Sequence, residues 1–573
     1  MASPTTFDFP PSWPNGRPPV VFSTESKWDH IFSSFTLDHQ VQEKYAEAIL
    51  ELKEEARSML TMAEGKTMSE RLVLIDTLER LGVGYHFDQQ IEDQLENILT
   101  KFDLENEGYD LFTTALLFRI LRQHHVFDKF IDQDKRFKES LCDDAEGLLS
   151  LYEATHLRIH GEQILDEALT FTVHHLKRMV QQLESPLQDL VKRALERPLH
   201  RGLPRMETRH YISSYEKYNL RNQQLLKLAK LDFNYVQNIY KKELHKLTRW
   251  WNELNPHLPY ARNRIVAAYL WGVAFHFEPQ YSYVREAVTK VVQILTVLDD
   301  TYDNYATIEE ADKFTEAVQR WNIDEIDCLP DYMKPIYKCV LKMYDEYECE
   351  AVERGKPFAI PYAKQTEIHV NIHRDTIKVG SGNMYFVTLH KMKDICSAYN
   401  QGLKYTMGGQ ITSFEDYIQM TMISSIIYVG CAATFPGLES LSEETIDWFK
   451  SEPKIIRPLA EVCRYLDDVG SYERESQEGA LLTGLDFYVK YHGGSVEEAK
   501  VRFEELAEDA WKRFNTEWVR NLKSSSVPKE VVEEFLGYLR AADVVYRDSR
   551  DGYAKCHIMA PEVEGLFIDH IIV

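Results

Sequence analysis

The chain has 573 residues, which is too long for a single ordinary core and predicts two domains. Its 66 basic and 91 acidic side chains give a formal net charge of -25, which disfavours binding to nucleic acid or to an anionic membrane surface. The eight cysteines form no CxxC pair and show no regular spacing, so neither a zinc site nor a disulfide framework is indicated. A protein this acidic must hold an anionic substrate by local means, such as divalent metal ions and a few placed arginines.

The N-terminal segment, MASPTTFDFPPSWPNGRPP, lacks the apolar core of a secretory signal. It also lacks the acid-free, arginine-rich pattern of an organelle transit peptide. We therefore expect a cytoplasmic protein.

Beyond residue 35 nearly every segment repeats its apolar residues at helical period, and few runs alternate in the way that strands require. We therefore predict an all-α fold. Because the clearest chemical motifs lie after residue 260, we predict a domain boundary near residue 228. Proline and glycine breakers separate the expected helices at 201–205, 255–260, 277–280, 329–335 and 435–437.

The first motif lies at the end of an apolar stripe that runs from Val284 to Tyr302 and predicts a helix packed on a core. Asp299 and Asp303 are one turn apart on one face of that helix, whereas Asp300 points about 100° away. Two like charges this close destabilise a helix unless a cation lies between them. Hard oxygen ligands suit Mg²⁺, so DDxxD is a candidate metal site; a solvated acidic helix end is the alternative.

The longest uncharged stretch, from Tyr417 to Leu438, is long enough to raise the question of a membrane span. Polar residues and Pro436 interrupt it, so we expect a buried core helix and no membrane span.

The second motif follows another apolar helix. Asp467, Ser471 and Glu475 are spaced at i, i+4 and i+8, so they share one face and could close on a metal ion. Gly470 costs up to about 1 kcal/mol of helix propensity relative to alanine, which indicates that something other than propensity requires it. A solvated acidic helix is again the alternative.

The two motifs together resemble the DDxxD and (N/D)Dxx(S/T)xxxE pair of class I terpene synthases. The resemblance extends over the whole chain and looks closest to cytosolic sesquiterpene synthases of plants; it includes RGLPRMETRHYI (201–212), LPYARNR (258–264), FEPQYS (277–282) and DGY (551–553). It implies an N-terminal αα-barrel-like domain (36–228) and a C-terminal class I helical bundle that carries catalysis (229–573). Residues 1–35 resemble a strap over the active site. The N-terminal domain has no DxDD motif, so we expect it to be non-catalytic.

The resemblance also implies three groups of site residues. The ligands of three Mg²⁺ ions, with Mn²⁺ as a possible substitute, would be Asp299, Asp303, Asp467, Ser471 and Glu475. The diphosphate would be bound by Arg262, Arg264 and Arg464. The pocket and its lid would include Trp271 at the floor, Ser424 and Ser425 at a helix break whose carbonyls point at the cation, Tyr546, Asp551 and Tyr553. A direct catalytic part would fall to Asp299, Asp303, Arg262, Arg264, Tyr546 and Asp551.

Two features depart from the family pattern. Residues 368–391, IHVNIHRDTIKVGSGNMYFVTLHK, look inserted; they contain GSG and a strand-like MYFVTL, and a retained intron or a tolerated surface excursion would explain them. Relatives usually carry a glutamate that orients metal-bound water where this chain has Gly402. Losing such a partner costs about 10- to 100-fold in metal affinity or activity.

We expect a sesquiterpene synthase that ionises farnesyl diphosphate and ends by proton loss or water capture. Geranyl diphosphate is the alternative substrate, which would make the protein a monoterpene synthase. A catalytically impaired homologue, or a non-catalytic helical scaffold, is a further alternative: the insertion and Gly402 favour it, whereas the intact set of metal ligands argues against it. A chain-elongating prenyltransferase is another enzyme alternative, but it would require two DDxxD motifs, and the second motif here is not one. The expected partner is a small-molecule prenyl diphosphate, and we expect a monomer.

Overall fold

A computed structural model describes residues 26–101, 109–124, 143–356, 384–406, 413–478, 483–522 and 527–573. These residues form helices joined by turns, with no strand among them, so the predicted all-α fold is confirmed. After the short α1 (Asp29–Ser33), the first half contains α2 (His39–Thr61), α3 (Met68–Arg80), α4 (Asp88–Lys101), α5 (Leu111–Gln123), α6 (Ala145–Thr155), α7 (Gln163–Met179), α8 (Leu187–Glu196) and α9 (Pro204–Tyr215).

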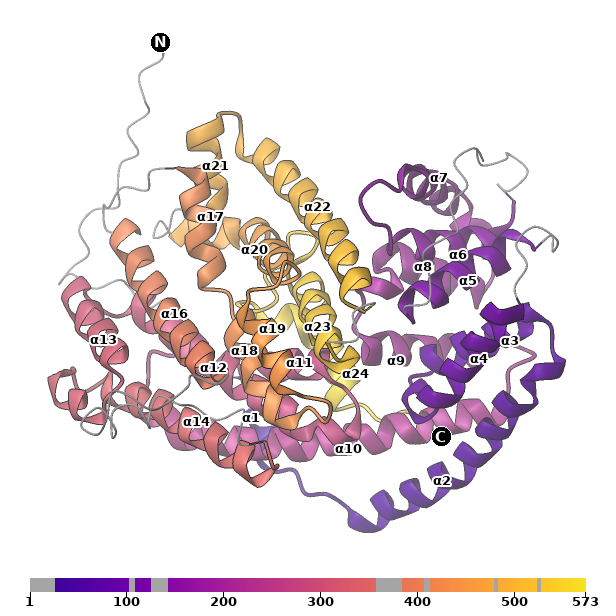
Figure 1. The fold of residues 1–573 in the computed structure, drawn as a ribbon, viewed down its shortest axis with the longest axis horizontal. Helices are drawn as coiled ribbons and strands as arrows, with labels where there is room; N and C mark the ends of the chain where they lie inside the picture. Colours follow the sequence, from indigo (N-terminus) through magenta and orange to yellow (C-terminus); the bar gives the residue numbers. More distant parts are fainter. Residues whose placement is uncertain are drawn as a thin grey trace, which may run out of the picture.

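The second half begins with the longest helix, α10 (Gln223–Leu254), which runs beneath both groups of helices (Figure 1). It continues with α11 (Ile265–Phe275), α12 (Ser282–Asn304), α13 (Ile308–Arg320), α14 (Lys334–Glu353), α16 (Met384–Thr406), α17 (Phe414–Ile423) and α18 (Ile427–Thr434). The chain ends with α19 (Glu443–Lys450), α20 (Ile456–Glu478), α21 (Gly484–His492), α22 (Val496–Leu522), α23 (Lys529–Tyr546) and α24 (Ala560–Phe567).

Local sequence sets several helix starts. Thr67, Thr307 and Thr483 each begin a helix with a reciprocal capping box, in which an acidic residue three positions later bonds back to the threonine N–H. Asn222 caps α10 by accepting from the N–H groups of Gln224 and Leu225. Such caps contribute about 0.5–2 kcal/mol each, because they satisfy N–H groups that have no partner within the helix.

The two halves share one core. A single cluster of buried apolar side chains runs from Trp28 to Phe567 and takes residues from both. Helix α10 is continuous through residue 228, where we predicted the boundary; the loop that precedes this helix lies at 216–222. The division into 36–228 and 229–573 stays a prediction.

Helices α11, α12, α16, α18, α20 and α23 pack against one another in the second half (Figure 1). Gly537 allows the close approach of α23 to α11, because a Cβ at this position would lie 2.1 Å from the carbonyl oxygen of Ala274. On α20, a Cβ at Gly470 would lie 2.1 Å from the carbonyl oxygen of Arg550. Packing of α20 against the 547–550 turn therefore explains the glycine in the second motif.

Three sequence expectations can be compared directly with the fold. The apolar stretch at 417–438 is divided at Ser424 into α17 and α18; 414–437 is also the one candidate membrane span in the described chain, and half of it is buried. The MYFVTL segment belongs to α16, which begins at Met384, so the strand-like expectation was wrong. Residues 1–25 of the strap and 368–383 of the insertion lie outside the described residues.

Candidate active site

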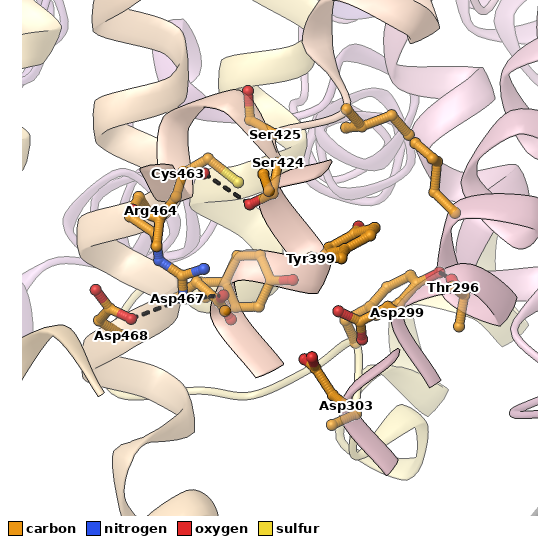
Figure 2. A pocket seen from close by; sticks show the side chains of 18 of the residues that line it. Thr296, Asp299, Asp303, Tyr399, Ser424, Ser425, Cys463, Arg464, Asp467 and Asp468 are labelled. Atoms are coloured by element: carbon orange, nitrogen blue, oxygen red, sulfur yellow. Dashed lines mark hydrogen bonds and ion pairs between the residues drawn. The ribbon is translucent and has the colours of Figure 1, made fainter. Parts of the chain in front are cut away.

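The second half encloses a cavity of about 350 Å³. Its lining comes from α11, α12, α16, α17, α20, α21 and α23, together with the segment that follows α23. Acidic side chains from α12 lie on one side and those from α20 on the other (Figure 2).

The first acidic group stands at the end of α12. Asp299 and Asp303 line the cavity, whereas Asp300 is fully buried and turns toward Arg262. The backbone N–H of Arg262 donates to Asp300 Oδ2 at 2.7 Å, and its guanidinium pairs with Asp299 Oδ2 at 2.6 Å. Burial, followed by the charge of Asp299, raises the pKa of Asp303 well above its ordinary value. Two carboxylates on this face therefore resist ionising together unless a cation lies between them.

The second acidic group stands on α20. Asp467 and Glu475 line the cavity, and burial raises the pKa of Glu475 to about 7. The hydroxyl of Ser471 is fully buried on the same helix and has no hydrogen-bond partner among the described residues. A buried oxygen without a partner beside two carboxylates fits a ligand to a bound cation.

The charge of the cavity favours a bound cation. In the part of the chain that the structure describes, its lining includes six carboxylates, Asp299, Asp303, Asp467, Asp468, Glu475 and Asp551, but only three guanidinium groups, Arg262, Arg464 and Arg474. An excess of negative charge in a confined space is costly, and it would repel a diphosphate. Divalent ions with hard oxygen ligands fit these residues and would reverse the excess.

Across the described ranges, no three histidine, cysteine, aspartate or glutamate side chains converge on one point. An ion at either acidic group would therefore take its other ligands from water and from diphosphate oxygens, as Mg²⁺ prefers.

The arginines divide into two kinds. Arg262 and Arg464 line the cavity, and Arg464 pairs with Asp467 and with Asp468, at 2.7 Å from Asp468 Oδ1. Arg264 does not line it; its Nε donates to the carbonyl of Tyr553 at 2.8 Å and its Nη2 to that of Ala554 at 3.0 Å. In this structure Arg264 therefore holds the segment after α23 rather than facing the site.

That segment brings Asp551 and Tyr553 to the cavity, and Tyr546, the last residue of α23, lines it beside them. Asp551 accepts from Arg474 Nε at 2.7 Å, and the Tyr553 hydroxyl lies 2.5 Å from Thr296 Oγ1. The segment is thus tied to both α20 and α12.

The rest of the wall is apolar and aromatic. Trp271, Tyr399, Tyr417, Phe487 and Tyr538 contribute rings to it. Tyr417 stacks on Phe487 with centroids 4.7 Å apart, and Trp271 meets Tyr538 at 5.2 Å. Ring faces stabilise a neighbouring positive charge, and the lining keeps bulk water out.

The predicted helix break at Ser424 and Ser425 is present between α17 and α18, and both residues line the cavity. Of the other predicted site residues, Arg264 and Ser471 are absent from the lining, and the remaining ten are brought together. Sequence reasoning gave no role to Arg474, Tyr399, Tyr417 or Tyr538. A signal existed for Tyr538, because it lies eight residues before Tyr546 and so shares its helix face.

An all-helical bundle whose cavity joins two acidic groups and arginines to an aromatic wall defines the class I terpenoid synthase architecture. The chain belongs to the terpene synthase family. Its residues 27–195 match the terpene synthase N-terminal domain, and residues 252–373 and 367–513 match the metal binding domain of the family.

Curated relatives extend over nearly the whole chain. It is 46% identical to gamma-cadinene synthase of Ocimum basilicum, covering 97% of this chain and 98% of that one. It is 44% identical to tau-cadinol synthase of Lavandula angustifolia, with the same coverage, and 45% identical to gamma-curcumene synthase of Pogostemon cablin, covering 96% and 97%.

Solved structures of terpene synthases are also similar to this chain over nearly its whole length. Limonene synthase with 2-fluorolinalyl diphosphate is similar with a TM-score of 0.84, 28% identity and coverage of 97% and 100%. Isoprene synthase from grey poplar, in complex with three Mg²⁺ ions and dimethylallyl-S-thiolodiphosphate, has a TM-score of 0.81 at 28% identity, with coverage of 96% and 99%.

Proposed function

We propose that this protein is a sesquiterpene synthase that uses Mg²⁺ to ionise farnesyl diphosphate, cyclises the resulting cation, and ends by proton loss or water capture. The observation that carries the proposal is one cavity whose lining combines acidic side chains and guanidinium groups with aromatic rings. The cadinol, cadinene and curcumene named for its relatives are C15 compounds, which supports a C15 substrate.

The acidic groups would hold three Mg²⁺ ions, through Asp299 and Asp303 on α12 and Asp467, Ser471 and Glu475 on α20. When bound, the ions supply positive charge that stabilises the leaving diphosphate. The same residues would accept Mn²⁺, which also prefers oxygen ligands.

Arg262 and Arg464, which line the cavity, would bind the diphosphate. Arg262 and Arg464 now pair with carboxylates, and a diphosphate drawn in with cations would compete for these guanidinium groups. Guanidinium stays protonated and donates forked hydrogen bonds to phosphate oxygens, so it favours the state in which the leaving group carries full charge. We assign Arg264 a positioning role, because it fixes the backbone of Tyr553 and Ala554.

Once diphosphate has left, the chain must shape and protect the cation. Trp271, Tyr417, Tyr538, Tyr546 and Tyr553 present aromatic rings around it. The contacts of Tyr553 with Thr296 and of Asp551 with Arg474 hold the last segment against the cavity and exclude water.

The test is to incubate the purified protein with farnesyl diphosphate or geranyl diphosphate, with and without Mg²⁺, and to analyse an organic overlay by gas chromatography with mass spectrometry. We expect C15 products from farnesyl diphosphate that appear only with metal. Products from geranyl diphosphate alone would make it a monoterpene synthase. Metal-dependent thermal stabilisation without any product would identify an impaired homologue.

A further inference from the structure

Asp468, the second aspartate of the motif on α20, differs from its neighbour Asp467 in what it contacts. Successive residues of a helix point about 100° apart, so Asp468 turns away from the face that carries the proposed metal ligands. Its side chain borders the cavity but is only 1% exposed, and its Oδ1 accepts from Arg464 Nη2 at 2.7 Å (Figure 2). This carboxylate is therefore directed at a guanidinium group and not at the ligand face.

Two other helices hold the Asp468 carboxylate in place. The Tyr417 hydroxyl of α17 donates to Asp468 Oδ1 in a long hydrogen bond of 3.4 Å, and the Tyr417 ring stacks on Phe487 of α21. At the start of α21, a Cβ at Gly484 would lie 2.1 Å from Asp468 Oδ2 and 2.9 Å from the Tyr417 ring. Any larger residue at Gly484 would displace both side chains, so α17 and α21 together fix where Asp468 lies.

Arg464 needs such an anchor because its other partner has a second use. In the described part of the chain its Nη2 contacts both Asp467 and Asp468, and a bound Mg²⁺ would engage Asp467. A diphosphate that enters with the metal then competes with Asp467 for the guanidinium, while Asp468 keeps the group in place and Nη1 can turn to a phosphate oxygen. A long side chain that is held before binding loses less conformational freedom on binding.

We propose that Asp468 is a positioning residue that holds the Arg464 guanidinium for the diphosphate, and that Gly484 of α21 sets the place of Asp468. This inference rests on the proposed function and gives α17 and α21 a part in binding the diphosphate. The sign of the effect separates this part from plain electrostatics. Removing a negative charge beside an anion site tightens anion binding, whereas releasing the arginine from its anchor weakens it.

The experiment measures the Kd of inorganic diphosphate by titration calorimetry at saturating Mg²⁺. We expect Asp468→Asn to raise this Kd by about two- to tenfold, the effect of immobilising one long side chain on binding. Gly484→Ala changes no charge and should raise the Kd similarly, because its Cβ would push Asp468 away. The controls should leave it unchanged: Asp331→Asn is at a side chain that is 97% exposed outside the cavity, and a Cβ at Gly65 in Gly65→Ala meets no atom within 4 Å.

A further pair of variants tests whether Asp468 acts through the arginine. In an Arg464→Ala background, Asp468→Asn should no longer raise the Kd, because no guanidinium remains to be held. Thermal melts without metal or diphosphate show whether each variant is folded before its affinity is compared.

The other outcomes are equally informative. An unchanged or lower Kd in Asp468→Asn would overturn the positioning role of Asp468, and an unchanged Kd in Gly484→Ala would overturn the role of Gly484. A rise in Kd that persists undiminished in the Arg464→Ala background would overturn the route through Arg464. A native protein that binds no diphosphate in the presence of Mg²⁺ would instead refute the proposed function, and the inference with it.

Discussion

At the scale of single residues, Asp303 shows why the acidic site needs metal. Burial and the charge of Asp299 raise its pKa, so an ionised pair is costly without a cation. We expect Asp303→Asn to reduce product formation by more than the about 10- to 100-fold typical of losing an outer partner of a metal site. A fluorescence melt should also show a smaller rise in unfolding midpoint when Mg²⁺ and inorganic diphosphate are added.

Asp331→Asn is the control, because the Asp331 side chain is 97% exposed outside the cavity. Equal Mg²⁺-dependent stabilisation in Asp303→Asn and Asp331→Asn would contradict a ligand role for Asp303.

Gly402 allows the opposite kind of test, in which a substitution adds a carboxylate beside the acidic group of α12. It lines the cavity on α16, and a Cβ built there meets no atom within 4 Å, so a larger side chain fits. It follows Tyr399 by three residues on the same helix, and Tyr399 lies close enough to Asp299 and Asp303 to feel their charge. We expect Gly402→Glu to lower the Mg²⁺ concentration for half-maximal activity by about tenfold. Gly402→Gln has the same shape without the charge, and an equal gain in that variant would disprove an electrostatic role.

At the scale of helices, two glycines in helix interiors should respond oppositely to alanine. Alanine normally adds about 0.5–1 kcal/mol of helix stability over glycine. Gly402→Ala should show this gain, because its Cβ meets nothing. Gly470→Ala should lower the unfolding midpoint and the activity, since its Cβ would collide with the carbonyl of Arg550 and displace the turn that leads to Asp551. Similar effects of the two substitutions in thermal melts would show that α20 tolerates movement there.

The junction of α11 and α23 contains a buried acid and base. Burial raises the pKa of Glu534 to about 8, and the pKa of His276 also ends above its ordinary value, because Glu278 and Glu534 outweigh the opposing effect of burial. The unfolded chain holds fewer protons at both sites. The ordinary pKa values are 4.5 for Glu534 and 6.5 for His276, and below them the stabilising effect of each raised pKa is fully present. This stabilisation is lost as the pH rises through the raised pKa values of the folded protein.

We consequently expect the unfolding midpoint of the metal-free protein to decrease as the pH is raised from 5 to about 8, and to decrease less steeply in Glu534→Gln. Glutamine can still accept from Thr434, which donates to Glu534 Oε2 at 2.9 Å. Glu497→Gln, at a side chain that is 80% exposed, controls for a general charge effect. Parallel pH profiles for Glu534→Gln and the native protein would show that this acid does not control the dependence.

Periodicity in the sequence was enough to predict the helices and both acidic groups, because i, i+4 spacing fixes which side chains share a face. It could not reveal that Arg264 turns toward the carbonyls of Tyr553 and Ala554, because that choice depends on a segment 289 residues away. It also misread MYFVTL as strand-like, because short apolar runs are ambiguous between strand and buried helix. The spacing from Tyr546 could have placed Tyr538 on the cavity face of α23, but its contact with Trp271 depends on the packing of α23 against α11, which no spacing within α23 encodes.

At the scale of the whole molecule, the two halves are joined by buried charge as well as by a common core. Glu508 of α22 pairs with Arg201, with Arg158 at 3.3 Å and with Arg547 at 3.4 Å. Arg158 and Arg201 come from the first half, so one carboxylate connects both. Asn515, two helical turns beyond Glu508, donates to the carbonyls of His156 and Arg158 at 3.1 and 3.0 Å. The N-terminal half thus supports α22, which packs on the catalytic helix α20.

Removing this carboxylate should weaken the whole molecule. Although burial opposes it, Arg201 and its fellow arginines hold the pKa of Glu508 well below its ordinary value, so the group is ionised when folded. Glu508→Gln leaves two buried guanidinium groups undercompensated, which costs about 3–5 kcal/mol for fully buried pairs and less here, because the glutamate side chain is 35% exposed. We expect a lower unfolding midpoint, and a second, earlier transition if the halves separate. Glu505→Gln, on the same helix but exposed and paired only with Arg502 among the described ion pairs, should change neither. An unchanged single transition in Glu508→Gln would mean that the apolar core alone unites the halves.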